Sequence, residues 1–306
     1  MCDQTDSADT AMRIEKRDVA SAFVIREIGD DDLAEVVALL CQGFPRRTPE
    51  YWRAGLQRLA TRERPPYTEK YGYVLATEDA LGGVVLTIAS DHEGDLNRQV
   101  FINISSWCAQ PSFWGAPARE LYRHACRRQD VTYTNLSAAA HTIKTITSFG
   151  FQEWTSGQMV AVGLKWDRSS LRKLHFLTLN EAKSIGISSA EARLLADHED
   201  FGCLAFCLET PNGLFPFVFV RRRIKGFVPC AQLIYCRNLG DLVEHGPAIS
   251  MWLAIRGFPF MIIDASATIN GLTGCYFPRK ARKYFKGPRP LKAVDHSYSE
   301  MVIFGF

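Results

Sequence analysis

The chain lacks several features that would narrow its class at once. It has no run of about 18 to 20 apolar residues, so we expect no membrane span, and its first residues lack the apolar stretch of a secretory leader. Its nine cysteines include no Cys-x-x-Cys pair, and several lie within apolar runs. These absences predict a cytoplasmic protein with reduced, buried thiols and without a metal.

An excess of charge of one sign is also missing. The 36 Lys and Arg residues against 33 Asp and Glu residues give a formal net charge of +3. This excess does not require a nucleic-acid partner, although it suits an anionic ligand. With 306 residues, 47% of them hydrophobic, the chain is long enough for two domains. Residues 1–20 show no apolar period and are expected to form a flexible tail.

The most informative stretch runs from residue 100 to residue 151. Its pattern predicts a strand over residues 100–108, a turn, a helix over residues 116–129 and a second strand over residues 131–136. A turn that leads from a strand directly into a helix presents unpaired N–H groups at the positive end of the helix dipole. Such a turn is a favourable binding site for a pyrophosphate.

The second part of the chain repeats this order. A strand over residues 230–236, a helix over residues 239–256 and a strand over residues 260–264 follow at a nearly constant shift. A repeat of this length indicates a duplicated domain rather than a solenoid, whose periods are shorter. We therefore predict an N-terminal domain over residues 21–165 and a C-terminal domain over residues 166–306.

The order of the predicted elements, with the turn and the later Gly150-Phe151, resembles the GNAT superfamily of acyl-CoA N-acyltransferases. The C-terminal sequence, ending in Phe304-Gly305-Phe306, is similar to bacterial tandem proteins called acyl-CoA acyltransferases. The resemblance implies an α/β fold of two tandem GNAT-like domains, each a central mixed β-sheet flanked by helices. It also implies acyl-CoA or acetyl-CoA as cosubstrate.

In this superfamily the fourth strand carries the pantetheine arm and the following turn holds the pyrophosphate. The residues that the resemblance implies for CoA binding are Ser106, Trp107, Cys108, Phe113, Trp114, Gly115, Ala116 and Ala118. Trp114 stands where the superfamily has an arginine, and Pro117 removes an N–H donor. The turn therefore indicates either CoA binding or a degenerate turn that keeps only the fold.

The positions that are catalytic in the superfamily match less well. Ile146 stands where many members of the superfamily have a tyrosine that serves as the acid, and Ala139 stands where they usually have an asparagine. In the second domain, Asp264 ends an apolar strand, where burial is expected to raise the pKa of its carboxyl towards that of a useful base. The alternative is that Asp264 caps the turn that begins at Ser266. Tyr235, at the end of another strand, is the second candidate catalytic residue.

Three functions remain open at this point. The leading one is an acyltransferase that moves an acyl group from acyl-CoA to an amine or hydroxyl of a small metabolite or a saccharide. The second is a noncatalytic acyl-CoA-binding or scaffold protein with a degenerate GNAT fold. The third is a Fem-type transferase that uses aminoacyl-tRNA, because the basic runs at residues 221–225 and 279–286 suit phosphate and base contacts. The alternative for these runs is a solvated edge strand or loop.

Overall fold

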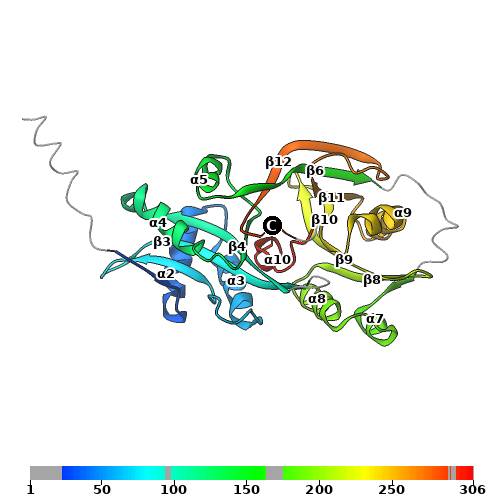
Figure 1. Ribbon diagram of the computed structural model, residues 1–306, viewed down its shortest axis with the longest axis horizontal. Helices are drawn as coiled ribbons and strands as arrows, with labels where there is room; N and C mark the ends of the chain where they lie inside the picture. Colours follow the sequence, from blue (N-terminus) through cyan, green and yellow to red (C-terminus); the bar gives the residue numbers. More distant parts are fainter. Residues whose placement is uncertain (1–22, 94–97, 163–174, 289, 291–293, 306) are drawn as a thin grey trace, which may run out of the picture.

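The computed structural model describes residues 23–93, 98–162, 175–288, 290 and 294–305. The predicted tail at residues 1–20 and the predicted domain junction at residue 165 lie outside these ranges. A single twelve-stranded mixed sheet forms the centre of the molecule, with helices on its faces (Figure 1). None of the described helices is both long and apolar enough to span a membrane.

The elements follow the chain in an order that repeats. The strands are β1 (Val24–Glu27), β2 (Gly72–Ala76), β3 (Leu81–Glu93), β4 (Arg98–Ala109), β5 (Thr132–Asn135), β6 (Gln152–Val162), β7 (His175–Leu177), β8 (Leu204–Thr210), β9 (Gly213–Ile224), β10 (Val228–Cys236), β11 (Phe260–Ala265) and β12 (Gly274–Lys286). The helices are α2 (Leu33–Gly43), α3 (Pro49–Thr61), α4 (Ala116–Ala125), α5 (Ile143–Ser148), α7 (Leu179–Ile185), α8 (Ser189–Asp200), α9 (Leu239–Ile255) and α10 (Glu300–Ile303), with 3-10 turns η1 (Asp30–Asp32), η2 (Pro111–Phe113) and η3 (Ala140–Thr142).

Local sequence explains where the long helices begin. Before α3, the hydroxyl of Thr48 accepts a hydrogen bond from the N–H of Tyr51 at 3.3 Å, and a proline occupies the first helical position. Before α9, Oδ1 of Asn238 accepts from the N–H of Asp241 at 2.9 Å. The predicted repeat of strand, helix and strand is confirmed, as β4–α4–β5 and β10–α9–β11. Helix α4 ends at Ala125, four residues earlier than expected.

The order of strands in the sheet shows the same duplication. It runs β1-β2-β3-β4-β5-β12-β6-β11-β10-β9-β8-β7, so that antiparallel strands lie at both ends and the parallel pairs β4–β5 and β10–β11 lie further in. We refer to β1–β6 with their helices as the first half and to β7–β12 with theirs as the second half. The predicted mixed sheet flanked by helices is confirmed.

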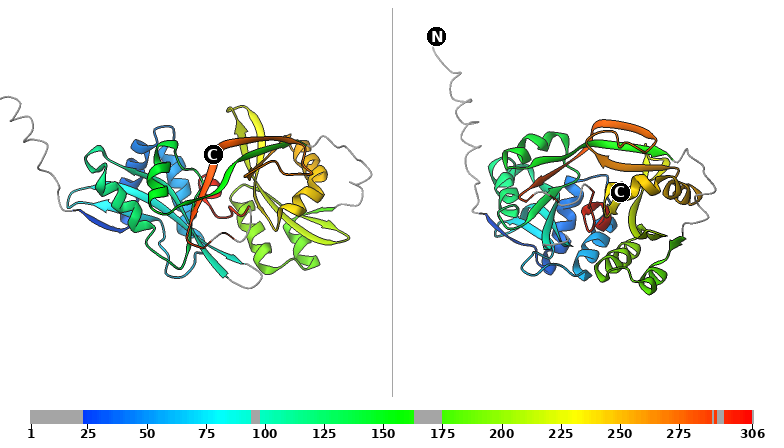
Figure 2. Two further views of the ribbon diagram at one scale, coloured as in Figure 1. Left: turned by 45° about the horizontal axis from the view of Figure 1, so that its top comes forward. Right: turned by 45° about the vertical axis from the view of Figure 1, so that its right-hand side comes forward.

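The two halves exchange their last strands. Strand β6 pairs with β11 of the second half, and β12 pairs with β5 of the first half. Strands β6 and β12 also pair with each other, antiparallel, and run side by side across the molecule (Figures 1 and 2). The two sheets expected from the sequence are therefore joined into one, and each half is completed by a strand of the other.

The basic runs do not form edge strands, which corrects one of the two expectations for them. Residues 221–224 belong to β9, between β8 and β10, and residues 279–286 belong to β12, between β5 and β6. Arg222 turns inwards and donates a hydrogen bond to Oε1 of Gln232 at 2.5 Å, and Lys283 is buried. One side chain of each basic run is therefore directed into the interior of the sheet.

Residues 294–305, here named the C-terminal segment, return through the centre of the molecule. Figures 1 and 2 show α10 of this segment between the two halves. All four residues of α10 are buried. Ile303 and Phe304 pack into the core formed by α2, α3 and β3, whereas Met301 and Val302 pack with residues of α8, β9 and β10. The segment therefore contributes to the cores of both halves.

This exchange predicts that cutting the chain between the halves will not separate them. A specific protease site inserted within residues 163–174 should give two fragments on a denaturing gel but one particle of native mass by size-exclusion chromatography with light scattering. The reason is that the β6–β11 and β12–β5 ladders remain after the cut. Elution of two separate fragments without denaturant would contradict the exchanged topology.

Candidate functional site

In the first half, β4 and β5 pair over a short distance and then diverge. Their parallel register covers three residue pairs, from Phe101 opposite Thr132 to Asn103 opposite Thr134, whereas β4 continues to Ala109. Beyond Asn103, one edge of β4 therefore extends past the register with β5. We refer to this point of divergence as the β4–β5 fork.

A β-bulge shapes β4 just beyond the fork. Two residues of β4, Ser106 and Trp107, together face the single residue Val85 of β3. Ser106 has a φ of 50°, in the left-handed region that costs a non-glycine residue about 1–2 kcal/mol. A bulge turns backbone groups out of the regular ladder and re-aims the strand. Here it does so at two residues that the sequence predicted to contact CoA.

The side chains beside the bulge point into different cores. The Trp107 ring packs against Tyr122 of α4 at 4.8 Å, and its Nε1 is buried without a hydrogen-bond partner among the described residues. The Cys108 thiol instead faces α2, with Sγ 3.7 Å from the carbonyl oxygen of Leu39. Burial raises the pKa of the Cys108 thiol to about 12, so the thiol stays protonated and is a poor nucleophile.

The predicted pyrophosphate turn leads directly into α4. It contains Phe113, Trp114, Gly115, Ala116 and Ala118. Trp114 is 68% exposed, and its Nε1 donates to the carbonyl oxygen of Ala109 at 2.9 Å, which closes the end of β4. Gly115 has a φ of 89°, and a Cβ placed there would meet no atom within 4 Å. The space before the first turn of α4 is therefore open.

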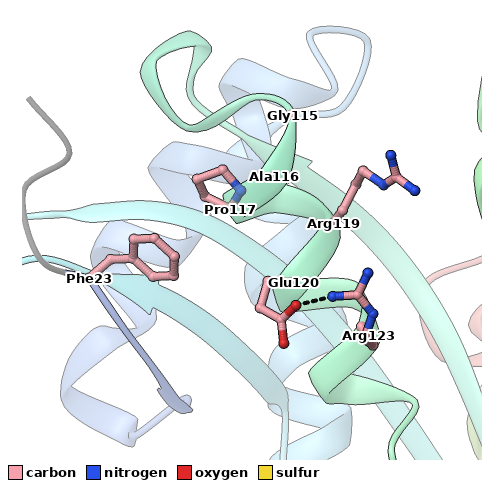
Figure 3. A pocket seen from close by; sticks show the side chains of 7 residues that line it. All are labelled: Phe23, Gly115, Ala116, Pro117, Arg119, Glu120 and Arg123. Atoms are coloured by element: carbon pink, nitrogen blue, oxygen red, sulfur yellow. Dashed lines mark hydrogen bonds and ion pairs between the residues drawn. The ribbon is translucent and has the colours of Figure 1, made fainter. Parts of the chain in front are cut away.

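A pocket of about 590 Å³ lies over this turn (Figure 3). It is lined by Phe23, Gly115, Ala116, Pro117, Arg119, Glu120 and Arg123. Figure 3 shows Arg119 and Arg123 extending from α4, with Arg123 paired to Glu120. Both guanidinium groups also lie over the ring of Phe149, at 5.7 and 5.3 Å. The sequence reasoning missed these arginines, although two cations four residues apart just after the turn were a usable signal.

In the second half, β10 and β11 diverge in the same way, but the chain itself occupies the fork. Their parallel register ends at Gln232. Beyond it, the N–H of His296 donates to the carbonyl oxygen of Ile234 at 2.8 Å, and Asp295 forms an antiparallel bridge with Tyr235. The C-terminal segment therefore pairs with the part of β10 that corresponds to the bulge of β4.

Tyr235, predicted to be catalytic, lies at this occupied fork. It is buried, and its hydroxyl lies 3.5 Å from Oε1 of Glu191. Burial raises the pKa of the Tyr235 phenol well above its ordinary value, so the phenol stays protonated. Glu191 also binds Arg237 at 2.5 Å. The structure thus places Tyr235 in a packed network of the second half.

Asp264, the other predicted catalytic residue, lies within β11 at the centre of the sheet and is 1% exposed. Its Oδ1 accepts from Nε2 of Gln158, and its Oδ2 from Nε2 of Gln232, both at 2.8 Å. His296 Nε2 lies 3.2 Å and Lys283 Nζ 3.9 Å from Oδ2. Donors from β6, β10, β12 and the C-terminal segment thus surround this one carboxylate.

Two expectations about Asp264 are corrected by this geometry. It does not cap the turn at Ser266, because both oxygens accept from side chains of other elements. Its pKa is not raised: burial alone would raise it, but Lys283, His296 and Gln158 hold the pKa of Asp264 at about 2. A carboxylate with so low a pKa is a weak base. The surroundings of Asp264 therefore favour a structural role.

A second buried line of polar groups ties β3 to the C-terminal segment. Nε2 of His92 lies 2.9 Å from Oγ of Ser90, and its Nδ1 lies 2.9 Å from Oδ2 of Asp295. This order is that of a serine–histidine–aspartate relay. The three residues are only 5%, 7% and 6% exposed, and His92 is stacked on Phe101 at 4.1 Å. We therefore assign the line to anchoring Asp295 rather than to attack on a substrate.

The C-terminal segment also carries a candidate that the sequence reasoning missed, Glu300. Its N–H donates to Oδ1 of Asn103 at 2.8 Å, and the nearby hydroxyls of Ser105 and Ser137 favour the charged form of its carboxyl. Burial raises the pKa of this carboxyl, and the residue is 8% exposed. No local pattern links Glu300 to β4, because the two are 197 positions apart.

Solved structures of similar fold include an N-acetyltransferase and a putative acetyltransferase. A GCN5-related N-acetyltransferase from Anabaena variabilis ATCC 29413 is similar over 86% of this chain and 72% of that one, with a TM-score of 0.57 and 10% identity. A putative acetyltransferase from Pyrococcus horikoshii is similar over 92% and 94%, with a TM-score of 0.53 and 15% identity. No protein-family model and no curated protein sequence matches the chain. The likeness confirms the predicted GNAT fold, and at these identities it shows the fold alone.

Replacing Asp264 by asparagine should destabilise the protein. The variant leaves the buried ammonium of Lys283 without its counter-charge, which should lower the free energy of unfolding by about 3 kcal/mol in urea titrations at neutral pH. The control is Asp130→Asn, which breaks the exposed pair with Arg128 and should cost less than about 1 kcal/mol. An unchanged unfolding energy in Asp264→Asn would contradict the structural role.

The difference in stability between the wild type and Asp264→Asn should also depend on pH. Folding lowers the pKa of Asp264 from 3.8 to about 2, so its stabilisation is present above about pH 4 and is lost as the pH falls through 2. A shift of this size corresponds to about 2 kcal/mol. The difference in unfolding energy between the wild type and Asp264→Asn should shrink by that amount from about pH 5 to about pH 2. A difference that stays constant with pH would show that the pKa of Asp264 is not lowered on folding.

Proposed function

We propose that the first half binds an acyl-CoA at the β4–β5 fork and that the protein transfers the acyl group to an amine or hydroxyl of a small metabolite or a saccharide. The observation that carries the proposal is the fork itself, with its bulge at Ser106. An exposed strand edge pairs with an extended ligand through backbone N–H and C=O groups. Pantetheine, which contains two amide groups, is such a ligand.

The turn and pocket at the start of α4 support the same placement. Phosphate groups suit the N-terminus of a helix, and the open space before Gly115 leaves room for them. Arg119 and Arg123 supply positive charge at the same pocket, in place of the arginine that Trp114 replaces in the turn. In this proposal Phe113, Ala116 and Ala118 shape the turn, whereas Trp107 forms a wall of the acyl-CoA site.

The backbone beside Ser106 stabilises the negative charge that develops during acyl transfer. Attack on the thioester carbonyl places negative charge on its oxygen, and backbone N–H groups held in a fixed position stabilise that charge. The bulge turns such groups out of the ladder at Ser106 and Trp107. The side chain of Cys108 faces α2, so in this proposal only its backbone takes part.

The second half is an unsuitable site for a second acyl-CoA. Its corresponding fork is paired with Asp295 and His296 of the C-terminal segment. This contrast supports one acyl-CoA per chain. The proposal includes a cytoplasmic location, and the eight cysteines among the described residues are free thiols. Tyr235 and Asp264 have no part in this reaction scheme.

Acetyl-CoA titrated into the purified protein by calorimetry, followed by a thiol-release assay with several acyl-CoAs and acceptors, tests the proposal. Binding with one site per chain and acceptor-dependent release of CoA would support an acyltransferase. Binding without thiol release would instead favour the noncatalytic acyl-CoA-binding alternative. Failure to bind acetyl-CoA, together with salt-sensitive binding of aminoacyl-tRNA, would favour the Fem-type alternative.

A substitution at Gly115 tests where the phosphates bind. Gly115→Asp should weaken acetyl-CoA binding at least about tenfold relative to Gly115→Asn, which corresponds to about 1.4 kcal/mol, because it places a negative charge beside the phosphates. The asparagine variant is the matched control, since it has the same shape and the same strain at a φ of 89°. Equal affinities of the two variants by calorimetry would move the phosphates away from this turn.

A further inference from the structure

Glu300 is held where β4 and β5 separate. The last pair in register is Asn103 with Thr134, and the hydroxyls of Ser105, on the β4 side, and Ser137, on the β5 side, are neighbours of the Glu300 carboxyl. The N–H of Glu300 is fixed by Oδ1 of Asn103 at 2.8 Å. This carboxyl therefore lies where the two strands diverge at the β4–β5 fork, close to the bulge.

One oxygen of this carboxyl lacks a hydrogen-bond donor within the part of the chain that the structure describes. Oε1 of Glu300 is buried and has no hydrogen-bond partner among the described residues, although the residue is more than nine-tenths buried. Buried charged oxygens normally have donors, so the atom indicates that a donor is missing. The cation facing it, Lys283, donates to the carbonyl oxygen of Leu136 at 2.6 Å and lies 3.9 Å from Asp264. Lys283 is thus engaged by other groups.

Residues beside the buried carboxyl lie at the surface of the protein. Ser137, one of its two hydroxyl partners, is exposed, and Ser106 beside the other is half-buried. A group that displaced the Ser137 hydroxyl would come directly from solvent to the carboxyl of Glu300. An ammonium group suits this place, because it carries both the positive charge and the donors that Oε1 lacks.

We propose that Glu300 is the general base of the acyl transfer and that the acceptor is a primary amine; this rests on the proposed acyl-CoA site. The carboxylate binds the acceptor as its ammonium ion and takes one proton from it. The amine nitrogen then attacks the thioester carbonyl, a C–N bond forms, and the C–S bond breaks. CoA leaves as a thiolate and receives the second proton lost by the nitrogen, while the proton on Glu300 passes to solvent.

The groups around Glu300 are consistent with this role. Lys283 of β12, Tyr122 of α4 and Tyr51 of α3 are the titratable side chains that interact with it electrostatically. Burial raises the pKa of both tyrosines, so neither is a base near neutral pH. Since burial also raises the pKa of Glu300, kcat/KM should increase with pH through an inflection above the ordinary range of a glutamate.

The test uses the full chain with acetyl-CoA, tyramine as the amine and tyrosol as its hydroxyl counterpart, extended to a panel of primary amines and matched alcohols. Glu300→Gln removes the base and keeps the shape. Glu244→Gln on α9, where the glutamate side chain is 60% exposed, is the matched control. Glu300→Asp keeps the charge and serves as a second variant if the glutamine variant folds poorly. Melting temperature and acetyl-CoA affinity are measured for every variant.

The proposal expects Glu300→Gln to lower kcat with the amine at least about 100-fold and to lose the pH inflection, with acetyl-CoA affinity unchanged within twofold. Glu300→Asp should keep the inflection at reduced kcat, and Glu244→Gln should match the wild type. Turnover of Glu300→Gln within threefold of the wild type, an inflection that persists in it, or transfer by the wild type to alcohols alone would overturn the proposal. A wild type that does not bind acetyl-CoA would instead overturn the proposed function.

Discussion

The antiparallel pairing of β6 with β12 is the constraint on which the rest of the structure depends. Because β12 lies between β5 and β6, the chain leaves its last strand at the centre of the molecule rather than at an edge. The C-terminal segment must then return between the two halves, where it contributes apolar side chains to both cores. This return brings Asp295 and His296 to one fork of the sheet and Glu300 to the other.

The duplicated halves have become unequal through this one segment. Each half has a parallel pair of strands that diverges after three residue pairs, with a bulge on the longer strand. In the second half the segment supplies a backbone partner, and in the first half it supplies a carboxyl. Buried polar contacts hold it in place, because the ring of His92 lies 2.9 Å from Asp295 and the ring of His296 lies 3.2 Å from Asp264. A buried carboxylate is costly without partners, so removing either histidine should destabilise this arrangement.

Local patterns in the sequence were sufficient for the repeated order of strand, helix and strand. The turn before α4 was recognised from its place between a strand and a helix. The exchange of β6 and β12 could not be recognised, since an alternating strand shows the same pattern whichever strand it joins.

The surroundings of Asp264 were misjudged for a related reason. Its partner Lys283 lies within a basic run that resembled solvated surface, and only the pairing of β12 turns that lysine inwards. Glu300 carried no local signal, because its neighbours on β4 come from a distant part of the chain.

The exchanged strands also set an order of events during synthesis. A first half with its own complete sheet could fold as soon as it emerged from the ribosome, but here β5 waits for β12. Between the end of β6 at Val162 and the end of β12 at Lys286, synthesis at about 5–20 residues per second takes roughly 6 to 25 seconds. During that time the edges of β5 and β6 are unpaired, and such edges invite association with other chains. Strands β5 and β6 therefore depend for their protection on a strand that is made much later, and a nascent chain stalled in the second half would be more hazardous than one stalled before β5.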